Sequence, residues 1–198
     1  MGLVDRVKNI LLNPAKEWEV IDGEAATVAG LYTGYILPLA AITPICQAIG
    51  YSVFGIHLPF VGTWRTPIGS AITSAIVTYI LTLAGVYLLH LIIDNLAPTF
   101  GGTRSSIQAL KVAAYSYTAA WVAGFFALIP GLRFLTILGL YSLYLLYLGL
   151  PVLMKSPKEK ALAYTAVVLI VGIIISVVIG FVAGRFISSP GMMGGYTP

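Results

Sequence analysis

The chain has 198 residues, of which 59% are hydrophobic and 9% are charged, and its formal net charge is +4. So few polar side chains cannot cover the surface of a soluble globule of this size, and the composition therefore excludes an ordinary water-soluble domain. Its single cysteine, Cys46, can form no disulfide within the chain.

Residues 1–27 carry charge throughout, and we predict that they form two short amphipathic helices on the cytoplasmic side of the membrane. Apolar side chains share one face of the first helix: Leu3, Val7, Ile10 and Leu11. This pattern suits a helix in the membrane interface or one packed under a bundle. The second helix opens at Pro14 and holds four acids and one base up to Glu24. Because acids are not drawn to anionic lipid, contact with a protein suits it better.

Five apolar stretches follow, and each reaches or nearly reaches the roughly 20 residues that a helix needs to cross a ~30 Å hydrocarbon layer. They are residues 28–56, 67–93, 112–129, 134–154 and 161–186. Because the bilayer core offers no water to backbone groups, stretches of this length cross it as helices. We therefore predict an all-α integral membrane protein, with a five-transmembrane-helix bundle in residues 28–187 and a disordered tail at 188–198.

The basic residues predict how this bundle is oriented. Five crossings put eight of them on the side of the N-terminus: Arg6, Lys8, Lys16, Arg104, Lys111, Lys155, Lys158 and Lys160. The other side holds Arg65, Arg133 and Arg185. Cytoplasmic loops carry the excess of Lys and Arg, so we expect the N-terminus in the cytoplasm and the C-terminus outside.

Four polar residues in or beside the stretches are candidates for a polar or transport site: Gln47, His90, Asp94 and Tyr144. Gln47 follows Pro44, which should kink the first stretch and free backbone carbonyls. His90 and Asp94 share a helix face and could relay a proton or receive Arg104 or Lys111; a hydrogen bond that fixes the helix end is the alternative. Tyr144 belongs to a group of deep tyrosines that could line a cleft or hydrogen-bond between helices.

Small residues recur every four positions along the fifth stretch: Gly172, Ser176, Gly180 and Gly184. Such a ridge lets another helix approach closely, which is a main source of helix association in lipid. The partner is either another helix of the same chain or a second copy, which would make a homodimer through the fifth helix.

The sequence contains no set of residues typical of catalysis. We find no glycine-rich phosphate loop, no nucleophile with its base and no cluster of metal ligands. We therefore expect no enzyme activity, cofactor, bound metal or nucleic-acid partner.

Several short motifs, weak alone, are specific in combination. They are Asn13-Pro14 with Glu17-Trp18, Ile21 and Glu24, then Phe100-Gly101-Gly102, Gln108-Ala109-Leu110-Lys111, Tyr115-Ser116-Tyr117-Thr118 and the run from Tyr144 to Pro151. From about Asn9 to Phe186 the chain resembles the prokaryotic branch of the Yip family (Ypt-interacting proteins). It has Ala119 and Ala120 where related sequences commonly place a proline.

The resemblance implies a five-helix membrane protein with a cytoplasmic N-terminus, here in a prokaryotic cytoplasmic (inner) membrane. Eukaryotic relatives are associated with small GTPases of the Rab class and with the traffic or shaping of early secretory membranes. They generally carry a longer cytosolic N-terminal region than the 27 residues found here, so the resemblance does not extend GTPase binding to this chain.

Two functional hypotheses follow. The first is a non-enzymatic scaffold that engages a protein partner or lipid at the cytoplasmic face through Glu17, Trp18, Glu19, Glu24, Arg104 and Lys111. The second is a small channel or transporter for an ion or small solute that uses Gln47, His90, Asp94 and Tyr144. We favour the first, because no charged residue lies in the middle of a predicted span.

Overall fold

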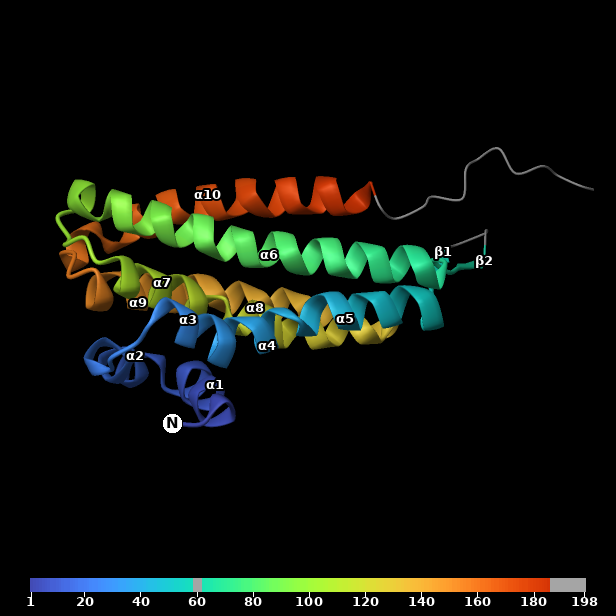
Figure 1. The fold of residues 1–198 in the computed structure, drawn as a ribbon, viewed down its shortest axis with the longest axis horizontal. Coiled ribbons are helices and arrows are strands. Elements are labelled where there is room, and N and C mark those ends of the chain that lie inside the picture. The colour runs from blue at the N-terminus through green and yellow to red at the C-terminus, as the bar shows by residue number, and fades with distance from the viewer. Residues whose placement is uncertain (59–61, 186–198) are drawn as a thin grey trace, which may run out of the picture.

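The computed structural model describes residues 1–58 and 62–185. The predicted tail at 188–198 lies outside the described residues. Within them, helical segments run back and forth along one long bundle (Figure 1). The N-terminal helices α1 (Leu3–Leu12) and α2 (Pro14–Gly23) lie against one side of this bundle, near one of its ends.

The first membrane segment consists of short helical pieces: α3 (Val28–Leu31), η1 (Tyr32–Ile36), α4 (Leu37–Ala40), α5 (Ile42–Ile49) and η2 (Gly50–Phe54). Both η1 and η2 are wider π-helical turns. A proline ring removes a backbone donor and crowds the preceding turn. The interruptions at η1 and Ala41 precede Pro38 and Pro44, where helix irregularities are expected.

A short antiparallel hairpin of β1 (Ile56–Leu58) and β2 (Gly62–Trp64) connects this segment to α6 (Ile68–Leu96). Ile56 pairs with Trp64, and Leu58 pairs with Gly62. Gly55 enters the hairpin with φ of +76°, a conformation that glycine adopts without steric cost. The all-α prediction did not include this hairpin.

After α6 come η3 (Ala97–Phe100), α7 (Ser106–Ser116), α8 (Thr118–Ala123), η4 (Gly124–Leu128), η5 (Pro130–Leu140), α9 (Tyr141–Leu153) and α10 (Lys158–Gly184). Four segments of the described chain are long and apolar enough to cross a membrane: Val28–Phe54, Ile68–Phe100, Pro130–Leu153 and Lys158–Gly184. The predicted span at 112–129 falls on α7, α8 and η4, which are not among these four. A fifth crossing therefore stays a prediction.

Two glycines bring the first membrane segment into close contact with η4. A Cβ atom on Gly124 would collide with Thr43, and one on Gly50 would collide with the carbonyl oxygen of Ala127. Small residues at such crossings let two backbones approach closely in lipid. α5 and η4 pack directly against each other, which holds the chain after α8 beside the first segment.

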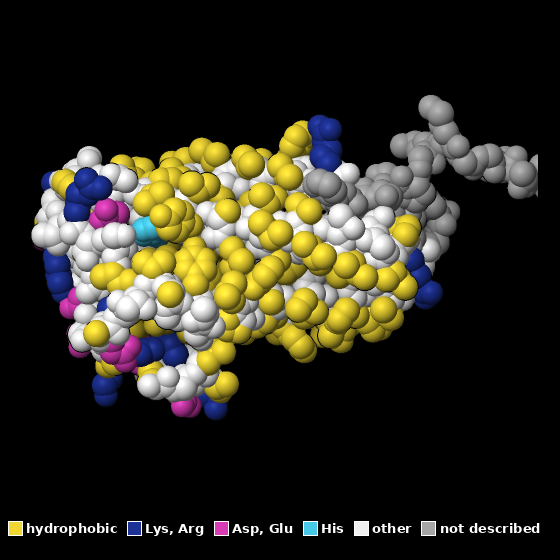
Figure 2. Space-filling model, viewed as in Figure 1, with side chains coloured by type: hydrophobic (Ala, Val, Ile, Leu, Met, Phe, Trp, Pro, Cys, Tyr) yellow, Lys and Arg dark blue, Asp and Glu magenta, His cyan; other side chains and the backbone are white. Residues whose placement is uncertain are grey.

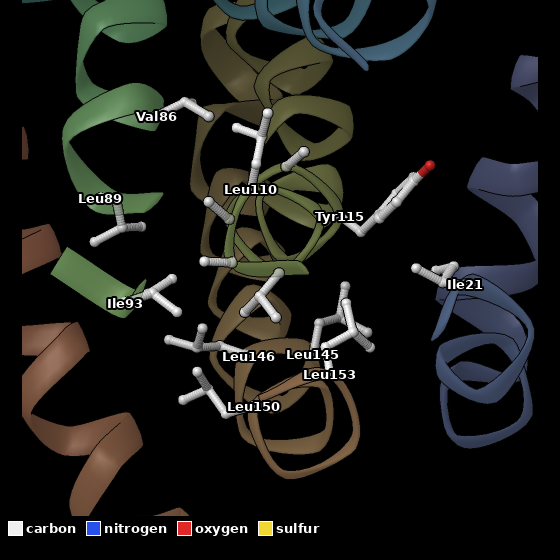
Figure 3. Close-up of a cluster of buried hydrophobic side chains, with 14 of the residues drawn as sticks. Ile21, Val86, Leu89, Ile93, Leu110, Tyr115, Leu145, Leu146, Leu150 and Leu153 are labelled. Carbon is white, nitrogen blue, oxygen red and sulfur yellow. The ribbon is translucent and has the colours of Figure 1, made fainter. Parts of the chain in front are cut away.

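The buried core lies in the half of the bundle nearest α2 (Figure 3). Figure 3 shows Leu89 and Ile93 of α6 facing the leucines of α9, with Tyr115 of α7 between them and α2. In contrast, isoleucines at every fourth position of α6 (Ile72, Ile76 and Ile80) point out of the bundle. Apolar side chains exposed in this way are typical of helices in contact with lipid.

Candidate functional site

Charged side chains gather at one end of the bundle, where α2, η3 and the first turns of α7 and α10 meet. We call this the charged end. In Figure 2 most of the visible Lys, Arg, Asp and Glu side chains lie there, whereas apolar side chains cover most of the bundle's length. The opposite end carries the β1–β2 hairpin and is called the hairpin end (Figure 1).

A buried arginine holds α1 and α2 together at the charged end. Arg6 of α1 is 5% exposed, and its guanidinium forms ion pairs with Glu17 of α2 and with Glu24, which follows α2. The guanidinium also lies 5.6 Å from the ring centroid of Tyr115. Burial works to lower the pKa of Arg6, but the hydrogen bond to Glu24 and the nearby carboxylates outweigh it and raise that pKa.

A buried lysine of α7 fixes the end of α2. Lys111 donates hydrogen bonds to the carbonyl oxygens of Ile21 at 2.8 Å and Glu24 at 2.6 Å. These carbonyls lie at the C-terminal end of α2, where a helix lacks its own donors and a cation is favourable.

The other contacts of α2 reach α7 and the loop after α9. Gln108 Nε2 donates to the backbone and side-chain oxygens of Asp22, both at 3.2 Å. Lys155 Nζ lies 2.6 Å from the other carboxylate oxygen of Asp22. Polar contacts thus bind α2 to α1, to α7 and to the loop after α9.

Trp18 inserts its ring into a gap in α9. The side chain is fully buried, and a Cβ atom on Gly149 would lie 2.7 to 2.9 Å from three of its ring atoms. Trp18 also meets the ring of Tyr115 edge to face at 6.2 Å, and Tyr115 meets Tyr35 at 4.6 Å. Only glycine at position 149 leaves room for this ring.

The six predicted partner-binding residues fall into two groups. Glu17, Trp18 and Lys111 are buried and engaged within the chain, so they present no surface to a partner. Glu19 and Arg104 are exposed, and the side chain of Glu24 is 40% exposed. A partner that meets the chain as described reaches only the second group.

Sequence reasoning missed Arg6 as part of this site, although a signal was present. Arg6 is three residues after Leu3 and four before Ile10, so it shares the apolar face of α1. A base on such a face indicates a buried ion pair, and here it finds Glu17.

The four predicted polar residues lie at three separate places. His90 Nδ1 donates to the carbonyl oxygen of Tyr87 at 2.7 Å, and its Nε2 lies 3.1 Å from the hydroxyl of Ser106. Asp94 forms an ion pair with Arg104 at 3.3 Å and has a second carboxylate oxygen buried without a partner in the described chain. These contacts are those of a helix end fixed by hydrogen bonds.

Gln47 and Tyr144 lie on other helices than this pair, Gln47 on α5 and Tyr144 on α9. Tyr144 is 47% exposed on α9 and stacks at a tilt against Tyr141. Gln47 instead lines a cavity of about 330 Å³ between α5, α6 and α10. Among the described residues, no group of three or more His, Cys, Asp or Glu side chains could hold a metal ion.

Most of the predicted small-residue ridge of α10 also borders this cavity. Ser176, Gly180 and Gly184 line it, and a Cβ atom on Gly180 or Gly184 would meet nothing within 4 Å. Gly172 borders a second cavity of about 180 Å³ between α9 and α10. Within the described chain, no helix therefore packs closely against the ridge at Gly180 and Gly184.

The arrangement can be compared with known proteins. A model of the Yip1 domain matches residues 8–179. The chain is similar to the inner membrane protein YohC of Escherichia coli K12 and of E. coli O6:H1, with 27% identity over 176 residues that cover 87% of this chain and 90% of each relative. No solved structure matches it. The matched region contains Glu17, Trp18, Glu24 and Lys111 of the site at the charged end, and the chain belongs to the Yip1 domain family.

Proposed function

We propose that the protein is a non-enzymatic membrane adaptor that presents the outer face of α2 to a protein partner in the cytoplasm. The observation that carries this proposal is the way α2 is held. Its inner face is bound by Arg6, Lys111 and Lys155, while Lys16, Glu19 and Val20 of its outer face are exposed. A helix that is already fixed loses little conformational entropy when a partner binds.

The proposal places residues 1–27 in the cytoplasm and five crossings in residues 28–187, with α7, α8 and η4 as the third. The eight basic residues at the charged end favour a cytoplasmic position for it. The similarity to an inner membrane protein of E. coli supports the same membrane for this chain.

The outer face of α2 has the composition of a protein-binding surface. Lys16, Glu19, Val20 and Gly23 follow one another at helical spacing, and all are exposed. Val20 is 42% exposed and offers an apolar centre between charges of both signs. An apolar centre with a polar rim is the usual plan of a protein interface.

The alternative of a channel or transporter receives less support. Gln47, Tyr144 and the His90–Asp94 pair belong to three separate places, and the contacts of His90 and Asp94 fix the end of α6. A relay would need these groups within hydrogen-bonding reach of one another.

A charge swap on the outer face of α2 tests the proposal. A photo-crosslinking residue at Ala15, which is exposed on α2, should capture a defined protein adduct in cells. Lys16→Glu with Glu19→Lys keeps the net charge but reverses the pattern, and we expect the adduct yield to fall about tenfold.

The matched control is Lys158→Glu with Glu159→Lys, which makes the same swap on exposed residues at the start of α10. This variant should leave the adduct unchanged, and both variants should keep the thermal stability of the wild type. An adduct that survives the α2 swap at full yield would rule out recognition through this face.

A further inference from the structure

The cavity between α5, α6 and α10 lies outside the site at the charged end. It extends from Thr66, just before α6, along that helix to Val86, and it reaches Gly184, the last residue of α10, so it lies toward the hairpin end of the bundle. Most of its lining belongs to segments that qualify as membrane spans. At about 330 Å³ it has the size of a site for a small ligand or part of a lipid.

The wall of the cavity carries several uncharged polar side chains. Ser74, Thr78 and Thr82 follow one another at intervals of four along α6, so their hydroxyl groups form one line on the cavity side of that helix. Gln47 of α5 adds an amide from the facing wall. The described residues that line the cavity include no charged side chain.

Several of these polar groups have no partner among the described residues. The hydroxyl of Thr66 is buried without a hydrogen bond to any of them, and Thr66 is only 4% exposed. The side chains of Gln47, Thr78 and Thr82 also hydrogen-bond no other residue in the described part of the chain. On the outward face of the same helix, by contrast, the Thr73 hydroxyl donates to the carbonyl oxygen of Gly69 at 3.0 Å.

An unpaired hydroxyl or amide group at membrane depth is costly, because hydrocarbon cannot replace its hydrogen bonds. A ligand that satisfies these groups must both donate and accept hydrogen bonds. A charged ligand would be strongly disfavoured in such a cavity, because the described lining residues include no charged side chain that could neutralise the ligand's charge. Arg133 lies over the ring of Tyr51 at 4.5 Å, and Arg65 and Arg185 precede or follow lining residues in the chain, but none of the three arginines is part of the lining.

We propose that this cavity binds an uncharged molecule with several oxygen groups. Two sources supply such a molecule: the glycerol moiety of a neutral lipid, or a free polyol. The hydroxyl groups of α6 and the Gln47 amide bind its oxygens, and Ile175 and Ile179 of α10 contact its apolar part. This site is independent of the adaptor role proposed for α2.

Native mass spectrometry of the full chain in detergent, with dioleoylglycerol or glycerol added, tests the proposal. Gly180→Leu should fill the cavity, because a Cβ atom there meets nothing within 4 Å and the helix need not move. We expect this variant to lower ligand occupancy about tenfold. Thr78→Val with Thr82→Val removes two hydroxyls at constant volume and should lower it to a similar extent.

Gly69→Leu and Thr73→Val are the matched controls, because both lie on the same helix α6 and neither lines the cavity. They should bind like the wild type. Binding of dioleoylglycerol alone identifies a lipid, and binding of glycerol alone identifies a soluble polyol. The proposal would be overturned if neither ligand bound, or if Gly180→Leu bound them as well as the wild type. It would also be overturned if the wild type formed a dimer without binding ligand and Gly180→Leu abolished that dimer.

Discussion

At the scale of single residues, the buried Arg6 is the group on which the N-terminal helices depend. It joins Glu17 and Glu24 in a setting where the side chains of Arg6 and Glu17 are each only 6% exposed. A buried pair is not strongly stabilising in itself, but removing one partner leaves the other charge without compensation. The motif residues Glu17 and Glu24 are therefore explained by internal contacts before any partner is considered.

We expect Arg6→Met to lower the free energy of unfolding by about 3 to 5 kcal/mol, because it leaves the Glu17 carboxylate buried and unpaired. Lys155→Met is the control: the side chains of Lys155 and Asp22 are 54% and 27% exposed in their pair, so its loss should cost less than about 1 kcal/mol. Denaturant titration in detergent measures both. Similar losses for the two variants would contradict the role given to Arg6, and Arg6→Met with Glu17→Leu should regain part of the loss.

At the scale of helices, the contact between α2 and α9 depends on the missing side chain at position 149. Gly149→Ala places a methyl group 2.7 Å from the rigid ring of Trp18, and we expect a loss of about 1 to 3 kcal/mol although alanine favours the helix. The rate of tryptic cleavage after Lys16 should rise as α2 is released. Gly69→Ala, which meets open space on α6, should not raise it.

Replacing Trp18 by Phe in the Gly149→Ala protein provides a second check. The smaller ring leaves room for the methyl group, so the rate of cleavage after Lys16 should return toward that of the wild type. If Trp18→Phe does not slow cleavage in this background, the gap in α9 is not what holds α2.

Helix boundaries could be predicted from the sequence where lipid alone sets them. α6 begins one residue after the start of its predicted span and ends three residues after its predicted end. The start of α7 could not be predicted in this way, because α7 begins at Ser106 and includes Lys111, whereas the predicted span begins after that lysine. In the sequence a charged residue marks the end of an apolar stretch. Here Lys111 lies inside α7, because it donates hydrogen bonds to the carbonyl oxygens of Ile21 and Glu24 at the end of α2.

At the scale of the whole molecule, the sequence predicted the membrane class and the family, because length and composition decide the first and a set of motifs decides the second. It could not predict the cavity, since Gln47, Thr78 and Ser176 are far apart in the chain and meet only when three helices lie side by side. Nor did the sequence-based prediction separate buried from exposed candidate residues: Glu17 and Glu19 are the same residue type, and they differ in that Glu17 is buried and Glu19 is exposed.

The number of membrane crossings can be tested by labelling cysteines placed on either side of the membrane. Single cysteines replace Lys16, Arg65, Lys158 and Arg185 in a Cys46→Ser background; all four positions are exposed. Five crossings with a cytoplasmic N-terminus put positions 65 and 185 outside, so an impermeant thiol reagent should label them in intact spheroplasts. Positions 16 and 158 should react only after the membrane is opened.

Four crossings would give a different pattern. If α7, α8 and η4 turned back on the side they started from, each later segment would cross in the opposite direction. Position 158 would then be labelled in intact spheroplasts and position 185 protected, while positions 16 and 65 would behave as before. The exchange between these two positions therefore decides whether the interrupted helices from Ser106 to Leu128 cross the membrane.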